Sequence, residues 1–159
     1  MSTWPPPPPP TVKRASWFGI KTIIVVALLG LVGLALVWRA GRSTYHNYQL
    51  ASSAVDQFHM QLNAGDYNTI YDEATDDFRR SGSREDITRF FTSIHEQMGS
   101  AGNKNAAGFH VNWRNGRVWV DQVFNTRFEK GQGQESFVWE IQQERPLLYH
   151  YRLDSPNFR

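Results

Sequence analysis

The distribution of apolar residues divides the chain into regions of different period. Residues 22–38 (TIIVVALLGLVGLALVW) form an unbroken apolar run without a charge. Extended to residue 20, this run would span about 28 Å as a helix, close to the hydrocarbon thickness of a bilayer. A core helix is rarely apolar on every face, and an amphipathic helix needs a polar stripe that is missing here. The run therefore predicts a transmembrane helix over residues 20–39.

Helical spacing follows the apolar run. Apolar residues recur at intervals of three and four, which predicts three helices over residues 45–62, 66–78 and 83–98. Gly65 is typical of a left-handed helix cap, and Ser83 with Asp86 three residues later is typical of a capping box. Phe58, Phe90 and Phe91 are expected on the buried faces. Residues 99–105 (GSAGNKN) are expected to form a flexible loop.

The period then changes to two, which predicts four strands over residues 109–113, 117–128, 135–142 and 147–153. Asn115-Gly116 is a strong hairpin signal. Alternation groups Leu147, Tyr149, Tyr151 and Leu153 on one face of the last strand, opposite Leu148, His150 and Arg152. Three helices followed by four antiparallel strands predict one α+β domain over residues 45–155, with the helices packed on a curved sheet.

The residues on either side of the apolar run indicate its orientation. Lys13, Arg14 and Lys21 precede it, whereas Arg39 and Arg42 follow it. This small bias favours a cytoplasmic N-terminus and a domain outside the cytoplasm, as in a single-pass protein of a bacterial inner membrane. The run is longer than the apolar part of a secretory signal, and Trp38-Arg39 at its edge is more typical of an uncleaved anchor.

The N-terminal tail, residues 1–19, contains six consecutive prolines. Proline lacks the backbone N–H and fixes φ, so this segment is expected to be a disordered tail with a short polyproline II rod. It could serve as a ligand for an aromatic groove or as a spacer without a partner.

The charge balance of the domain argues against nucleic acid as a partner. From residue 40 onward there are 13 Lys and Arg residues and 15 Asp and Glu residues, so the formal net charge is 13 − 15 = −2. The basic excess of the whole chain therefore belongs to the apolar run and its flanks, and the domain lacks the basic surface that phosphate binding needs. The absence of cysteine excludes disulfides and thiolate chemistry.

Two stretches carry a resemblance to a known superfamily. Ala64-Gly65-Asp66-Tyr67 followed by Ile70-Tyr71-Asp72-Glu73-Ala74 is similar to the opening of nuclear transport factor 2-like domains. Residues 126–131 and 135–139 resemble a strand pair of uncharacterised, membrane-anchored bacterial families in that superfamily. The resemblance implies a cone with a cavity between sheet and helices. Some members of the superfamily are enzymes, many only bind, and some assemble machines, so it implies a fold more than an activity.

Candidate chemistry is sparse. Enzymes of the superfamily often place an Asp–His or Asp–Tyr pair in the cavity, which makes Asp121, His110, His150 and Tyr71 the candidate pocket residues. The alternative is an Asp121 on the solvated side of the sheet, since Asn125 and Arg127 share its face. The spacing of the histidines predicts no metal site, and the acidic residues between 72 and 77 predict a self-compensated helix face next to Arg79, Arg80 and Arg84.

Two functions remain open at this stage. The first is a membrane-anchored, extracytoplasmic binding or assembly module without catalytic residues or cofactor, which contacts the bilayer through residues 20–39 and a protein partner or second copy through its sheet. The second is a small-molecule-binding or proton-transfer enzyme that uses the cavity of the cone. It needs a pocket of about 300 Å³ or more with at least two convergent polar groups.

Overall fold

The computed structural model describes the backbone of residues 17–158 and the side chains of residues 25–38 and 41–158. It divides into two units, Met1–Gly41 and Arg42–Arg159, which are described separately. A single helix, α1 (Trp17–Ala64), contributes to both units. The predicted tail lies outside the described residues except for 17–19, which already belong to α1.

The described part of the first unit is the beginning of α1, which contains the apolar run. Its large side chains are exposed, from 54% for Val25 to 72% for Val37. One helix near the N-terminus of the described chain is thus long and apolar enough to cross a membrane, as the sequence predicted.

The second unit begins with the remainder of α1, which ends at Ala64 before Gly65 with its positive φ of 73°. Three shorter helices follow: α2 (Tyr67–Asp72), α3 (Asp76–Arg80) and α4 (Arg84–Met98). The single helix expected over residues 66–78 is wrong, because Thr75 interrupts it. Its backbone N–H and its hydroxyl both donate to the carbonyl of Leu148, at 2.9 and 3.2 Å, and its Oγ1 accepts from Phe78 N to begin α3.

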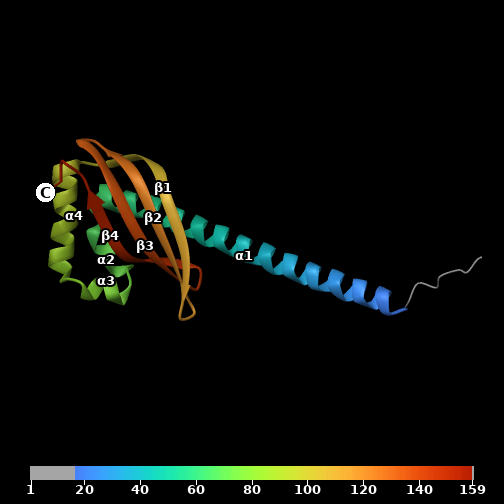
Figure 1. Cartoon of the computed structure of the whole chain (residues 1–159). Helices are drawn as coiled ribbons and strands as arrows, with labels where there is room; N and C mark the ends of the chain where they lie inside the picture. Colours follow the sequence, from blue (N-terminus) through green and yellow to red (C-terminus); the bar gives the residue numbers. More distant parts are fainter. Residues whose placement is uncertain (1–16, 159) are drawn as a thin grey trace, which may run out of the picture. The chain divides into compact units, whose positions relative to one another are not determined.

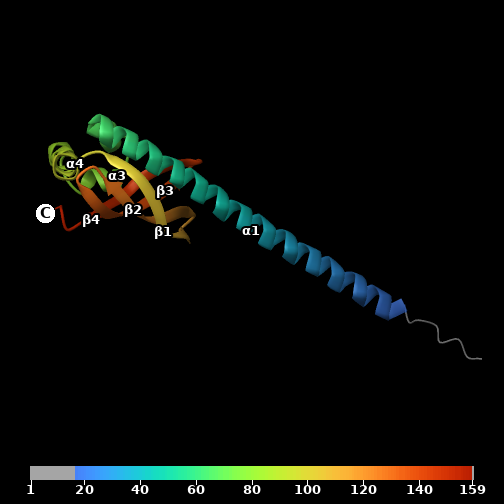
Figure 2. The same cartoon turned by 90° about the horizontal axis from the view of Figure 1, so that it is seen from above.

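The four expected strands are present and form one antiparallel sheet. The strands are β1 (Ala101–Arg114), β2 (Arg117–Phe128), β3 (Gly131–Gln142) and β4 (Arg145–Asp154), and they are neighbours in chain order. In Figures 1 and 2, the part of α1 in this unit runs along one face of the curved sheet. The fold of this unit is therefore α+β, as predicted.

The loop expected over residues 99–105 is wrong, because β1 already begins at Ala101. At the start of β1, the Asn63 side chain makes the backbone hydrogen bonds that a neighbouring strand would otherwise make. Its Oδ1 accepts from Ala101 N at 2.7 Å, and its Nδ2 donates to Ala101 O at 2.8 Å. Lys104 is paired in the ladder with Thr126 of β2. These long-range contacts order a segment whose composition is typical of a loop.

Aromatic rings fill the space between the helices and the sheet. Phe58 of α1 lies 5.6 Å from Phe91 of α4, 5.2 Å from Phe137 of β3 and 4.8 Å from Tyr151 of β4, measured between ring centroids. Phe137 and Trp139 are stacked at 5.7 Å, and both are at most 4% exposed. Both side chains therefore lie on the core face of β3. Phe90 is 37% exposed and lies at the edge of this cluster.

A β-bulge changes the expected faces of β4. Val138 of β3 pairs with His150, whereas the next residue, Trp139, pairs with Leu148. Tyr149 therefore has no partner on β3 and is the extra residue of the bulge. Leu148 is consequently buried in the core at 3% exposure, whereas Tyr149 contacts Trp119 on the other face. Strict alternation across β4 was therefore wrong, because an inserted residue reverses the phase of the strand.

Candidate functional site

Three of the four candidate residues lie in one row across the sheet. His110 of β1 pairs with Asp121 of β2, Asp121 with Val138 of β3, and Val138 with His150 of β4. The neighbouring residues Val120, Gln122 and Phe137 are buried against the helices, so the row lies on the opposite face, here called the outer face. Asp121, His110 and His150 therefore do not enter the space between sheet and helices. The solvated position that the sequence left open for Asp121 is the observed one.

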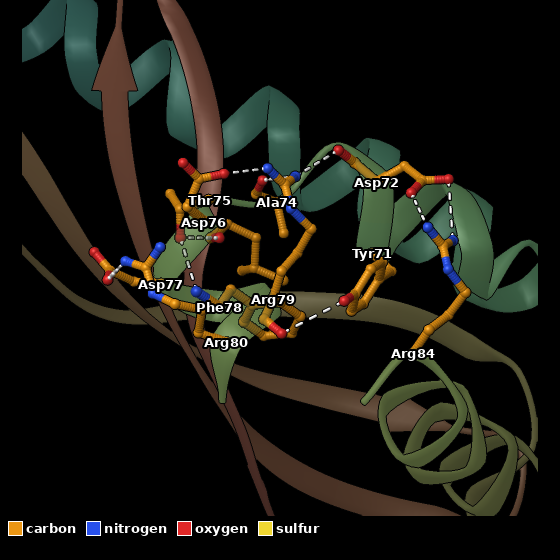
Figure 3. A network of polar contacts seen from close by, with 11 residues as sticks. Tyr71, Asp72, Ala74, Thr75, Asp76, Asp77, Phe78, Arg79, Arg80 and Arg84 are labelled. Carbon is orange, nitrogen blue, oxygen red and sulfur yellow. Dashed lines mark hydrogen bonds and ion pairs between the residues drawn. The ribbon is translucent and has the colours of Figure 1, made fainter. Parts of the chain in front are cut away.

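Tyr71, the fourth candidate, lies on the helix side, far from that row. Its hydroxyl donates to Arg79 O at 3.4 Å, and the Arg84 guanidinium lies 4.4 Å from the centre of its ring (Figure 3). The structure thus does not bring Tyr71 together with Asp121, and it gives the tyrosine a place in the contacts that join α2, α3 and α4.

Figure 3 shows the acidic residues of this region paired with arginines. Arg84 contacts both carboxylate oxygens of Asp72, and its hydrogen bond holds the pKa of Asp72 below its ordinary value of 3.8. Arg79 binds Asp76 and the carbonyl oxygens of Asp72 and Ala74. Arg80 pairs with Asp77. This network closes the corner between α2 and α4 and matches the self-compensated face expected from the sequence.

The interior contains a polar cluster that the sequence analysis missed. The Glu135 carboxylate, 0% exposed, accepts from Tyr151 OH at 2.8 Å and from Thr126 Oγ1, and it lies 2.9 Å from His59 Nε2. His59, Thr126 and Tyr151 are themselves at most 7% exposed. Burial, together with the negative charge of Glu135, raises the pKa of Tyr151 well above its ordinary value of 10.0.

A signal for this cluster was present in the sequence. Glu135 has the same parity as Phe137, Trp139 and Ile141 of its strand, so alternation places it on the core face. A carboxylate there needs polar partners. Its partners could not be identified from spacing, because His59 is 76 residues away on α1 and Tyr151 lies beyond the bulge in β4.

An acid–histidine pair is suited to proton transfer, but here it is sealed. The side chains of His59 and Glu135 are 8% and 0% exposed, and each hydrogen bond of the carboxylate is made within the protein. The rings of Phe58 and Phe137 lie 5.9 and 6.1 Å from that of His59, measured between centroids, and Phe128, Trp139 and Tyr151 belong to the same buried core. The cluster can satisfy buried polar groups and fix the mutual position of α1, β2, β3 and β4, but no substrate can reach it.

Among the depressions of the described surface, two have a wall of large apolar side chains. The first, of about 330 Å³, lies between α1, α2 and the β3–β4 hairpin. Its apolar wall includes Ala54, Ile70 and Trp139, and its polar wall includes Glu73 and Arg145. Gln57 and Gln61 donate to Glu73 Oε2 at 3.2 and 3.0 Å. The buried indole N–H of Trp139 has no acceptor among the described residues.

The second depression, of about 480 Å³, lies on the outer face of the sheet and is called the outer groove below. Trp119 and Tyr149 lie within it, with ring centroids 4.7 Å apart at an angle of 77°. Its polar residues come from β1, β2 and the turn between them: Asn112, Arg114, Asn115, Arg117 and Asp121. Of the four candidate residues, only Asp121 lines it, and neither depression contains His110, His150 or Tyr71.

A resident metal ion has no set of ligands in the described part of the chain, where no group of three His, Cys, Asp or Glu side chains is suitably placed. In comparisons with known proteins, no family model and no curated protein matches the chain. Its function is therefore argued from its own geometry.

Proposed function

We propose that this protein is a single-pass membrane protein whose folded domain binds a partner outside the cytoplasm and catalyses no reaction. The helix over residues 20–39 would cross a bacterial inner membrane, and the domain would be a cone of the nuclear transport factor 2-like type. The cone is supported by the order of the elements, by helices on one face of a curved four-stranded sheet, and by the Gly65-Asp66-Tyr67 corner.

Exposed apolar surface supports the position in the membrane. From residue 25 to residue 37, every leucine and valine is more than half exposed, and no charged residue interrupts the segment. In water such a surface would be costly, whereas lipid covers it without loss. The excess of Lys13, Arg14 and Lys21 over Arg39 and Arg42 supports a cytoplasmic tail.

The closed interior carries the preference for binding over catalysis. The acid–histidine pair of Glu135 and His59 has the composition of a proton-transfer site, but it is buried in the core, whereas the pair of His46 and Glu144 lies exposed at the surface. Asp121, His110 and His150 lie on the outer face, and of the three only Asp121 lines the outer groove. Binding requires only an accessible surface, and the outer face provides one.

Orientation is tested by fusing alkaline phosphatase after Arg159 of the full chain. The phosphatase folds only outside the cytoplasm, so an active fusion in membranes is expected, and a cytoplasmic reporter at the same position should be dark. An inactive phosphatase together with a bright cytoplasmic reporter would reverse the orientation.

Binding is tested by purifying the tagged full chain in mild detergent beside a shortened chain of residues 1–41. Molecules that copurify with the full chain and not with the tail and span depend on the domain. Identical sets of molecules in both samples would show that the domain binds nothing under these conditions, and the proposal would fail.

A second candidate function is small-molecule binding in the depression between α1, α2 and the β3–β4 hairpin. The observation in its favour is the indole N–H of Trp139, which is buried and has no acceptor among the described residues. Trp139 forms part of the apolar wall of this depression, whose volume is about 330 Å³. An apolar ligand with one acceptor atom would satisfy this N–H. The test is the Trp139→Phe variant, which keeps the ring and removes the donor. Fluorescence titration of an apolar carbonyl probe should weaken in that variant.

A further inference from the structure

We propose that the outer groove binds an acidic oligosaccharide, with the sugar rings against Trp119 and Tyr149 and the anionic group at Arg114. This inference deepens the proposed extracytoplasmic binding function and rests on it for its biological setting.

The bulge in β4 gives the groove its second aromatic ring. Without the extra residue, alternation from Tyr151 and Leu153 would point Tyr149 into the core. With it, Tyr149 is 38% exposed and stands nearly perpendicular to Trp119 on the outer face. Bulges often re-aim a side chain next to a functional site. The C–H faces of sugar rings carry little charge and can pack against aromatic rings. Two partly exposed rings set at an angle provide apolar surfaces for such packing.

The end of the groove near the β1–β2 turn carries two arginines directly opposite each other, Arg114 and Arg117. Like charges in such a cross-strand pair destabilise a sheet. Arg117 is balanced by the buried Glu140, with Nη1 at 3.2 Å from Oε1. Arg114 has no ion pair within the described part of the chain. A carboxylate or phosphate at Arg114 would offset this uncompensated charge and match its planar pair of donors.

The remaining polar groups of the groove suit hydroxyl groups. Asn112 and Asn115 offer amide donors and acceptors, and Asp121 offers acceptors four residues along β2 from Arg117. At about 3.3 Å per residue, the distance along the strand from Arg117 to Asp121 is about 13 Å. This length accommodates two to three linked sugar rings, and each hydroxyl can both donate and accept. A nucleic acid fits less well, because the domain from residue 40 onward has a net charge of 13 − 15 = −2.

The experiment uses the full chain in detergent micelles and isothermal titration with two matched tetrasaccharides. One is the hyaluronate tetrasaccharide, which carries glucuronate, and the other is neutral chitotetraose. We expect both to bind and the acidic one to bind more tightly. Arg114→Gln should weaken the acidic ligand about tenfold or more and leave the neutral ligand nearly unchanged. Trp119→Ala should weaken both. Arg152→Gln, a paired arginine elsewhere on the outer face, is the matched control and should change neither.

Three results would overturn the inference. Absence of binding of both tetrasaccharides at millimolar concentration excludes a saccharide site. Equal binding of inorganic phosphate and the acidic tetrasaccharide, both lost in Arg114→Gln and unchanged in Trp119→Ala, indicates an anion site alone. A protein partner that copurifies with the full chain and is lost in Trp119→Ala assigns the groove to a protein interface. The phosphatase fusion reports the orientation independently, so a failure of the saccharide proposal is distinguishable from a failure of the proposed membrane topology.

Discussion

Replacing Glu135 by alanine is the sharpest test of the interior. The carboxylate is fully buried and has three polar partners: His59 Nε2, Thr126 Oγ1 and Tyr151 OH. Because an ionised carboxylate only accepts hydrogen bonds, His59 must carry a proton on Nε2 to bond with it. In the native protein each of these three donors has Glu135 as its acceptor. Glu135→Ala leaves all three buried without that acceptor.

The expected loss follows from these contacts. Each buried donor left unsatisfied costs about 1–3 kcal/mol, and Glu135→Ala leaves three of them. We therefore expect Glu135→Ala to lower the free energy of unfolding by about 3–5 kcal/mol, a large part of the roughly 5–15 kcal/mol that stabilises a domain. For a domain of about this size, the melting temperature should fall by roughly 12–20 °C.

The measurement is urea denaturation of residues 45–159 followed by tryptophan fluorescence, with Trp139 as a buried reporter at 4% exposure. Glu135→Gln keeps the shape and one carbonyl acceptor, so its loss should be smaller than that of Glu135→Ala. Glu129→Ala, at an exposed glutamate in the β2–β3 turn, is the matched control and should stay within about 0.5 kcal/mol. A loss below about 1 kcal/mol for Glu135→Ala would refute the reasoning, since it would mean that water or another acceptor reaches the three donors.

Trp139→Ala should lower the free energy of unfolding by about 3–5 kcal/mol because a packed ring is removed, whereas Asp121→Asn on the outer face should change it by no more than about 0.5–1 kcal/mol. If urea denaturation showed almost no effect of Trp139→Ala, the core face of β3 would be misassigned. Residues 45–159 should form a soluble, self-sufficient domain with a cooperative thermal transition in circular dichroism, and a melt without cooperativity would contradict this. The pKa of Asp72 is lowered by its hydrogen bond to Arg84, so the stability that this pair contributes is present above the unfolded pKa of about 3.8 and is lost as the pH falls through the lower folded pKa. Asp72→Asn should therefore reduce the dependence of the unfolding free energy on pH in the acid range. An unchanged dependence in pH-dependent denaturation would show that the pair contributes nothing.

Much of the fold was predictable because its determinants are local. The glycine at position 65, the Ser83 cap and the Asn115-Gly116 turn each act within a few residues, and the structure contains an element boundary at each. The apolar run has no boundary at its end, because α1 continues to Ala64, so the two helices expected over residues 20–39 and 45–62 are one. The period of the apolar residues also predicted the four strands of the sheet.

The features that were missed depend on contacts between distant residues. Thr75 divides a helix because its N–H and hydroxyl bond to Leu148, and residues 101–105 join β1 in part because Asn63 satisfies the backbone of Ala101. Neither contact has a signal in the local sequence.

The sequence by itself determined where the apolar helix lies and the order of helical and strand segments, but it left the face occupied by Asp121 open. Only the tertiary structure decided that Glu135 pairs with His59, that a bulge turns Tyr149 toward Trp119, and that Arg114 faces Arg117 at the end of a groove. The physical reason is that periodicity reports which face a residue occupies, whereas the identity of its partner depends on strand register and on packing across the whole domain.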